Sequence, residues 1–510
     1  MNDKSRRAGV RAAMGALCLA GVIAIVSGCA YPIRNMQATD LNPTRGYRWS
    51  QLAEGRLNDT LVIVTASGGG TRATALTLSL LQGLQQVRLA PDDTLADEID
   101  IISSVSGGSV TAGYFALRGT AGLNDLTTEF IRKDGIAALA RAGLNPFGLA
   151  ALATPSKERI DVLIDYLDGQ LFHGDTYQAL LTRGRRPYLI LNAADMVEGV
   201  PFPLTQENLD LLCSDMTGMK LSVAVAASAA FPVALSPVTL KNYSKCPAQA
   251  GATWPPLWVT NAANTDRTRP ENVARAERGR VALAYALGSE AQTETKKQYV
   301  HLLDGGIADN LGLSEPLRAV TTNDPAPGLL NDIADGRIKR IVFVVVNSRS
   351  FATSPLDETQ ATPSALAMLN SSIAAAIDQA SVGFSARLRT TLDDAFTATA
   401  TDFRGDALQF GAPELLDKAA NLDAIKRNTF LMEVDFANIR DPVCRSYFHN
   451  IPTSWKLETS EIDALLAMGG ALLGEAPEFQ PMVQAIGGRM DRTLPSVASE
   501  CQKVTTNRNP

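Results

Sequence analysis

The sequence predicts an α/β protein with a mostly parallel central sheet and a layer of helices on each face. Three observations lead to this class. Short apolar runs rich in β-branched residues alternate with segments of helical periodicity, glycine-rich loops separate them, and 45% of the 510 residues are hydrophobic, which supplies a large core. No linker-like stretch interrupts residues 60–500, so we expect one large domain over residues 59–510.

The alternation begins with TLVIVTA at 60–66, a short apolar run that predicts a buried strand. RATALTLSLLQGLQQV at 72–87 carries leucines at helical spacing and predicts a helix. IDIIS at 99–103 predicts a second strand, and another helix should follow Gly108. Later strands are predicted at 186–196, 299–306, 338–348 and 429–436, and later helices at 158–170, 364–392 and 460–473. The polar segment 261–298 is interpreted as a solvent-exposed insertion.

The N-terminus has the three-part layout of a bacterial lipoprotein signal peptide over residues 1–28. A basic leader precedes an apolar core, and small residues stand directly before Cys29, which is then the lipidated residue. An ordinary signal peptide and an uncleaved membrane helix are the alternatives. Ala30 favours the outer membrane, so we expect a lipid-anchored protein of the cell envelope that faces the periplasm. The polar residues 29–58 are interpreted as a tether.

The charge balance and the cysteine content indicate which ligands and which crosslinks to expect. Beyond residue 28 the chain has 43 basic and 52 acidic residues, a balance that does not suit nucleic acid. Four cysteines remain after the signal and Cys29, and an even number in an oxidising compartment suggests two disulfides. Pairing of sequence neighbours is expected: Cys213 with Cys246, and Cys444 with Cys501. A zinc site is the rival reading, but the chain has no C-x-x-C pair.

Four serines lie in IDIISSVSGGSV at 99–110, and one of them fits a nucleophile on a sharp strand-to-helix turn. Such a turn needs very small residues two positions before and two after the serine. Only Ser106 meets this test, with Ser104 before it and Gly108 after it, and Gly107 between. An ordinary turn of small residues is the alternative.

The preceding loop, SGGGTRA at 67–73, carries the triplet Gly68, Gly69 and Gly70. A Walker P-loop is excluded because no G-K-[ST] follows. A dinucleotide-binding fingerprint fits G-x-G-x-x-A, but the next strand does not end in the acidic residue that would bind a ribose. The third reading is an oxyanion hole, in which the N–H groups of Gly69 and Gly70 bind a negative oxygen and Arg72 orients the loop or holds a phosphate.

Three scattered histidines offer no convincing catalytic base for Ser106. Asp304, in contrast, ends an apolar strand and is followed by Gly305 and Gly306. Its carboxylate could accept the Ser106 proton directly, in a dyad without histidine. The alternative is that Asp304 only stabilises a turn, as Asp-Gly pairs often do.

SGGGTRA, SVSGG and the late DGG, in this order, resemble the patatin-like phospholipase family, and SGGGTRA is also similar to the loop of cytosolic phospholipase A enzymes. VAVAASAAFPVALSPVTL at 223–240 and the segment 192–215 resemble further blocks of the family. The resemblance implies a patatin-like fold and a hydrolase of fatty-acyl esters, such as phospholipids or lysophospholipids. It implies Ser106 as nucleophile, Asp304 as base, and Gly69, Gly70 and Arg72 in the oxyanion loop, with no metal or cofactor required. Ser104 stands where the family has glycine, which leaves a lipid-binding scaffold without turnover as the rival function. Beyond residue 350 no motif is assignable.

Overall fold

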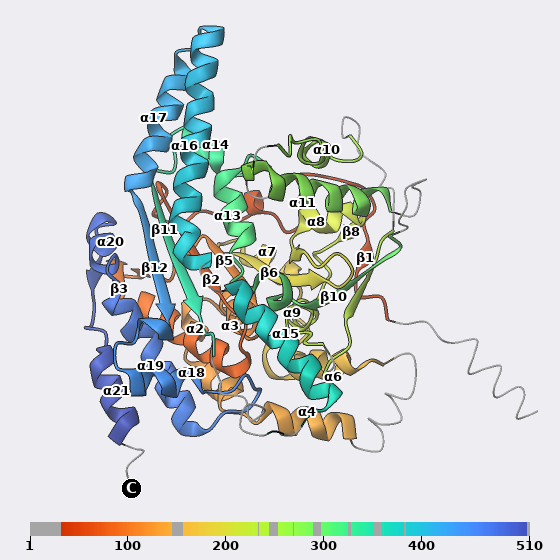
Figure 1. The fold of residues 1–510 in the computed structure, drawn as a ribbon, viewed down its shortest axis with the longest axis vertical. Helices are drawn as coiled ribbons and strands as arrows, with labels where there is room; N and C mark the ends of the chain where they lie inside the picture. The colour runs from red at the N-terminus through yellow and green to blue at the C-terminus, as the bar shows by residue number, and fades with distance from the viewer. Residues whose placement is uncertain are drawn as a thin grey trace, which may run out of the picture.

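A computed structural model of the chain describes residues 32–506, apart from residues 145–156, 233, 244–252, 269, 289–296, 325–327, 351–359, 361 and 382–383. Its centre is an eight-stranded sheet with helices on both sides (Figure 1). Two small sheets lie outside it. One pairs β1 (Met36–Gln37) with β8 (Ser214–Asp215), and the other joins β3 (Val87–Ala90) to β4 (Asp93–Thr94) and β13 (Arg489–Met490).

The main sheet is mostly parallel, as predicted. In spatial order its strands are β12 (Thr429–Asp435), β11 (Arg340–Asn347), β2 (Thr60–Ala66), β5 (Ile101–Val105), β6 (Tyr188–Asp195), β10 (Tyr299–Asp304) and β9 (Val238–Lys241), with β7 (Pro201–Leu204) paired to β6. The strands from β12 to β6 are parallel, whereas β10, β9 and β7 run antiparallel to their neighbours. The central strand β2 is fully buried, which explains why its sequence is an unbroken apolar run rather than an alternating one.

Strand β5 shows how the sheet separates two helix layers. Successive side chains of a strand point to opposite faces. Ser103 donates a hydrogen bond to the carbonyl of Gly312 on one face, while Ser104 bonds Ser109 on the other. Helices α2 (Gly70–Leu84), α3 (Gly107–Arg118) and α9 (Leu221–Ser228) belong to the Ser104 side, and α13 (Ser314–Thr321) to the Gly312 side. The remaining helices up to residue 334 are α4 (Gly135–Leu144), α6 (Arg159–Leu167), α7 (Tyr177–Arg183), α8 (Gln206–Leu211), α10 (Leu257–Ala263), α11 (Pro270–Leu287), α12 (Gly306–Asp309) and α14 (Leu330–Ala334).

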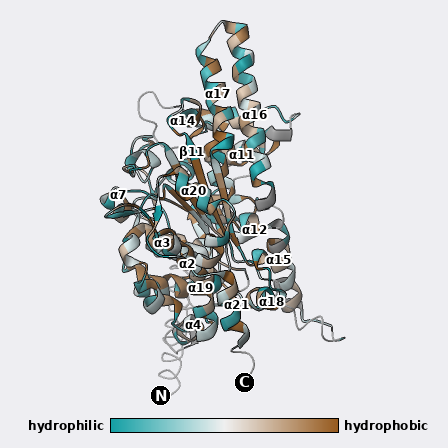
Figure 2. Cartoon of the chain, turned by 90° about the vertical axis from the view of Figure 1, so that its left-hand side faces the viewer, coloured by the Kyte–Doolittle hydropathy of each residue, from teal (hydrophilic) through white to brown (hydrophobic). Residues whose placement is uncertain are grey.

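The chain beyond residue 350, to which the sequence assigned no role, is part of the same body. It contributes the edge strand β12, and α19 (Thr459–Glu475) packs along α2. The helix predicted at 364–392 is two helices, α15 (Ala365–Ser381) and α16 (Phe384–Phe410). With α17 (Glu414–Arg427), α16 forms a hairpin that projects beyond the end of the sheet (Figures 1 and 2). The last helices are α18 (Pro442–His449), α20 (Phe479–Ala485) and α21 (Val497–Thr506).

The tether predicted at 29–58 is wrong for the described residues, which form a strap bound to the domain. The Tyr47 ring is fully buried and stacks on Tyr188, and its hydroxyl accepts the N–H of Leu189 in β6 at 2.7 Å. Arg48 is also buried and pairs with Glu207 and Asp210 of α8. The partners in these contacts are more than a hundred residues apart in the sequence. The composition of the strap alone therefore could not predict them.

The interpretation of residues 261–298 as solvent-exposed does not hold for α11, because part of this helix is buried. Ala276, Val281, Ala282, Tyr285 and Ala286 on one face of the helix are buried. Three arginines of α11, Arg275, Arg278 and Arg280, pair with acidic side chains elsewhere in the domain, as Arg275 does with Asp324 at 2.8 Å.

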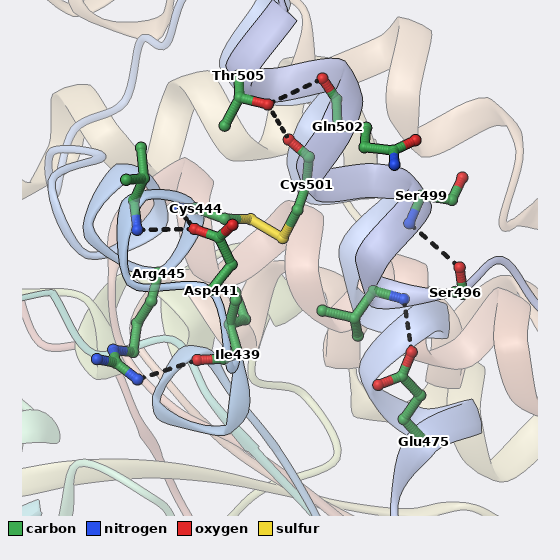
Figure 3. Close-up of a disulfide and its surroundings, with 12 residues drawn as sticks. Ile439, Asp441, Cys444, Arg445, Glu475, Ser496, Ser499, Cys501, Gln502 and Thr505 are labelled. Carbon is green, nitrogen blue, oxygen red and sulfur yellow. Dashed lines mark hydrogen bonds between the residues drawn. A yellow bond between two sulfur atoms is a disulfide. The ribbon is translucent and has the colours of Figure 1, made fainter.

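The predicted disulfide between Cys444 and Cys501 is present and ties α18 to α21 (Figure 3). It removes both cysteines from any zinc site. Cys213 is disulfide-bonded, and Cys246, its predicted partner, lies outside the described residues, as does Cys29. Within the described part of the chain, no helix is both long and apolar enough to span a bilayer.

Candidate active site

Ser106 stands on the sharp turn that its flanking residues predict. It directly follows β5 and directly precedes α3, with a backbone φ of 51° and ψ of −120°. A positive φ is costly for a residue with a side chain, of the order of 1–3 kcal/mol, and persists only where the surroundings enforce it. Such strain at a strand-to-helix turn is a feature of nucleophile elbows.

Close packing of two glycine loops enforces this turn. A Cβ on Gly107 would lie 2.0 Å from the carbonyl oxygen of Gly70, and one on Gly108 would lie 2.7 Å from that of Ser67. Both distances are far below contact, so only glycine fits at either position. The residues on the C-terminal side of Ser106 therefore meet the size limit that a sharp turn imposes.

On its N-terminal side, Ser104 replaces the usual glycine without a clash. Its side chain is fully buried, and its Oγ lies 3.1 Å from Oγ of Ser109 in α3. The extra atoms of the serine are thus accommodated by a hydrogen bond across the elbow.

Asp304 lies beside Ser106 although its strand does not belong to the parallel part of the sheet. Strand β10 runs antiparallel to β6, and its register places Asp304 opposite Ala193, one residue beyond the point where β6 pairs with the end of β5. The Ser106 hydroxyl donates to Oδ2 of Asp304 at 2.8 Å, and the N–H of Gly306 donates to Oδ1 at 2.9 Å. Gly305 is tightly enclosed, because a Cβ there would lie 2.1 Å from the carbonyl oxygen of Asn192.

Burial makes Asp304 a stronger base than a free aspartate. The side chain is almost entirely enclosed, and this desolvation raises the pKa of Asp304 to about 6, against the opposing effect of the Gly306 and Ser106 hydrogen bonds. A base with a pKa nearer to neutral is better matched to accepting a hydroxyl proton at physiological pH.

The glycine triplet forms the wall facing Ser106. A Cβ on Gly68 would lie 3.3 Å from Cβ of Ser106, so the loop passes directly beside Ser106. Gly69 and Gly70 have φ values of 144° and 57° and open α2. The N–H of Gly68 donates to Asn310 and that of Thr71 to Ser454, which leaves the N–H groups of Gly69 and Gly70 without an acceptor among the described residues. Two such donors at a helix N-terminus suit an anionic oxygen.

Arg72 anchors this loop to the C-terminal part of the chain. Its side chain is buried and donates to the carbonyl oxygens of Ser348 and Ile451 and to Oγ1 of Thr453. Of the two roles predicted for Arg72, orientation of the loop agrees with these contacts, because three donors are committed to protein acceptors.

Four further residues hold the site and were not singled out from the sequence. Asn310 and Ser454 bind the glycine loop, Ser348 donates from Oγ to the carbonyl of Gly68 at 2.8 Å, and Ser228 accepts the N–H of Ser106. Ser228 lies in the segment 223–240 that resembles the family, and Asn310 follows the DGG sequence by four residues, so both lie in or near motifs visible in the sequence. Ser348 and Ser454 come from the unassigned C-terminal part.

The Ser106 hydroxyl donates to a carboxylate, and His301 and His449 bond elsewhere. His301 lies inside β10, as expected, with Nδ1 at 3.0 Å from Thr239 Oγ1, and Nδ1 of His449 lies 3.3 Å from the carbonyl oxygen of Arg349. Among the described residues no cluster of His, Cys, Asp or Glu could hold a metal ion. The geometry therefore offers a serine paired with a carboxylate.

A strained serine on a strand-to-helix turn of an α/β sheet, hydrogen-bonded to a buried acid, is the arrangement of a serine hydrolase with a two-residue centre. The chain belongs to the patatin-like phospholipase family, whose model matches residues 64–317. This segment contains both glycine loops and Asp304, and membership implies lipid acyl hydrolase activity.

Among solved structures, the chain is similar to human GIVD cytosolic phospholipase A2. The sequence identity is 12% and the TM-score 0.32, over 62% of this chain and 49% of that one. The similarity thus spans about half the length of the human enzyme. No curated protein matches the chain.

Proposed function

We propose that the protein is a serine lipid acyl hydrolase that cleaves fatty-acyl esters of phospholipids or lysophospholipids through an acyl-enzyme. The observation that carries the proposal is the 2.8 Å hydrogen bond from the Ser106 hydroxyl to Asp304. Both groups are buried at the junction of the two loops that the family model covers.

The cycle has two acyl-transfer steps. Oγ of Ser106 attacks the ester carbonyl carbon while Asp304 takes the hydroxyl proton, and the tetrahedral intermediate then expels the alcohol, which takes that proton from Asp304. Water attacks the acyl-enzyme by the same route, with Asp304 again accepting a proton and returning it to Ser106. The N–H groups of Gly69 and Gly70 are the proposed donors to the oxyanion, and Arg72 positions their loop.

Hydrolysis of a panel of phospholipids, lysophospholipids and neutral esters tests this proposal. We expect turnover of at least one fatty-acyl ester, with the Ser106→Ala variant inactive. Ser103→Ala is the matched control, because Ser103 is also buried but donates to the Gly312 carbonyl on the other face of the sheet. Undiminished hydrolysis by Ser106→Ala would refute the assignment.

A lipid-binding scaffold without turnover is the second candidate, motivated by Ser104 at the position of the elbow glycine. A fluorophosphonate probe separates the two functions, since it reacts with an activated serine whatever the natural ester is. A folded protein that neither labels at Ser106 nor hydrolyses any ester would favour the scaffold.

For the location we propose an N-terminal lipid anchor at Cys29 in the outer membrane, facing the periplasm, after removal of residues 1–28. The support is the sequence pattern around Cys29. Mass analysis of the mature N-terminus tests it: a diacylated or triacylated cysteine is expected, and an unmodified Cys29 or an intact leader would contradict it.

A further inference from the structure

We propose that Ser228 is a positioning residue that fixes the Ser106 elbow and the Asp304 loop relative to each other. This inference rests on the proposed function, since it assigns Ser228 a part in the same reaction. Ser228 is the last residue of α9 and its side chain is fully buried. It forms hydrogen bonds with Ser106 and with Gly305, the residue that follows Asp304.

The first contact is to the strained elbow. Oγ of Ser228 accepts the backbone N–H of Ser106 at 3.0 Å. Ser106 lies between β5 and α3, so its N–H belongs to neither the hydrogen bonds of the sheet nor those of the helix. A buried N–H without an acceptor is strongly disfavoured. Ser228 therefore provides the acceptor for the backbone N–H of Ser106.

The second contact is to the loop that follows Asp304. The carbonyl oxygen of Ser228 accepts the N–H of Gly305 at 3.1 Å, and that of Ala230 accepts the N–H of Asp304 at 3.0 Å. The backbone at the end of α9 thus holds the backbone of Asp304 and Gly305, while the side chain of Ser228 holds the backbone of Ser106. A shift of this helix end would change the 2.8 Å distance between the two reacting side chains.

The directions of the hydrogen bonds around Ser228 follow from its proton count. A serine hydroxyl has one proton to donate and two lone pairs. Ser228 must donate to the carbonyl oxygen of Asn192, 2.6 Å away, because a carbonyl cannot donate. Oγ of Ser109, 2.9 Å from Oγ of Ser228, must therefore be the donor in that contact, and Ser104 must donate to Ser109.

Three serine hydroxyls thus form a directed chain, Ser104 to Ser109 to Ser228, that ends on Asn192. Both lone pairs of Ser228 are used, one by Ser109 and one by the N–H of Ser106. This chain also gives Ser104 a function: its hydroxyl orients Ser109, which in turn orients Ser228. A glycine at position 104 would remove the first link and leave the other two in place.

The test is the second-order rate constant for fluorophosphonate labelling of Ser106, together with kcat and KM for the best ester. For Ser228→Ala we expect labelling and kcat to fall about tenfold to a hundredfold, the effect of losing one or two buried hydrogen bonds at a reacting group, with KM little changed. Ser222→Ala is the matched control, because Ser222 lies on the same helix, is equally buried and donates to Asp168 instead. It should label at the wild-type rate.

The links further along the chain should matter less. Ser109→Ala keeps the bonds of Ser228 to Asn192 and Ser106 and should lower labelling a few-fold, and Ser104→Gly should lower it less than Ser109→Ala. Should Ser228→Ala not fold, Ser109→Ala decides: a slower rate in folded protein supports the proposal, and a wild-type rate overturns it.

Wild-type labelling of folded Ser228→Ala would overturn the positioning role while leaving the proposed function intact. An equal loss in Ser222→Ala would also overturn it, since the effect would then belong to the helix as a whole. Wild-type protein that neither labels nor hydrolyses esters would instead defeat the proposed function.

Discussion

Replacement of Asp304 by asparagine should greatly slow hydrolysis and, at neutral pH, stabilise the protein. The amide keeps the size of the carboxyl and can still accept the N–H of Gly306, but it cannot take a proton from Ser106. Loss of a general base lowers the rate about a hundredfold to ten-thousandfold, and we expect kcat to fall within this range.

The gain in stability follows from the pKa. Burial raises the pKa of Asp304 from 3.8 to about 6, so the folded protein keeps this proton up to a higher pH than the unfolded chain does. The free energy of unfolding of the wild type therefore decreases between about pH 4 and pH 6 through this group, and the loss persists above. Two units at about 1.4 kcal/mol each give about 3 kcal/mol, which asparagine does not lose because it does not titrate.

Urea unfolding of Asp304→Asn and the wild type at pH 4 and pH 7.5 measures this difference. All other titratable groups are common to both proteins, so the change in the difference between the two pH values reports Asp304 alone. We expect the variant to gain about 3 kcal/mol relative to the wild type on going from pH 4 to pH 7.5. A pH-independent difference, or retained hydrolysis, would refute the reasoning.

Other perturbations test the remaining parts of the argument. In the wild type, log(kcat/KM) should rise with pH and level off above about pH 6, as Asp304 ionises; a flat profile from pH 4 to pH 8 would contradict its role as base. Gly107→Ala should abolish activity or folding because its Cβ would meet the Gly70 carbonyl, whereas Gly169→Ala, with nothing within 4 Å, should be tolerated in activity assays and thermal melts. Arg48→Met should cost about 3–5 kcal/mol in urea unfolding because two buried carboxylates lose their partner, whereas Arg45→Met, on an exposed side chain, should cost less than about 1 kcal/mol. Reduction of the Cys444–Cys501 bond, which closes a 57-residue separation, should cost up to about 4 kcal/mol in the same assay, and an unchanged midpoint would contradict this.

The sheet and the dyad could be predicted because their signals are local. Strand β2 spans the predicted residues 60–66. A short apolar run of β-branched residues, with a polar segment before it and glycines after it, is typical of a buried strand. Ser106 was identified because the tight turn limits the size of its neighbours, and Gly107 and Gly108 meet that limit in the structure. Asp304 was identified beside a strand end, although the antiparallel direction of β10 was not foreseen.

What the sequence could not predict depends on contacts between distant residues. The strap looked like a tether because the partners of Tyr47 and Arg48 lie near positions 189 and 207. Arginines of α11 look solvated until Asp324 is placed beside them. Ser454, which accepts the N–H of Thr71, carries no motif at all. Such pairings depend on the completed topology and leave no periodic pattern in the chain.

The strap also limits the distance between the domain and a membrane in which Cys29 is anchored. Arg34 is already paired with Asp161, and Asn35 donates to the carbonyl of Lys241 at 2.8 Å. A lipid on Cys29 would be five residue steps from Arg34, a distance of at most about 18 Å at full extension. The domain would then rest against its own bilayer and search for substrate in two dimensions, so its rate would follow the surface density of susceptible lipid rather than the bulk concentration of vesicles.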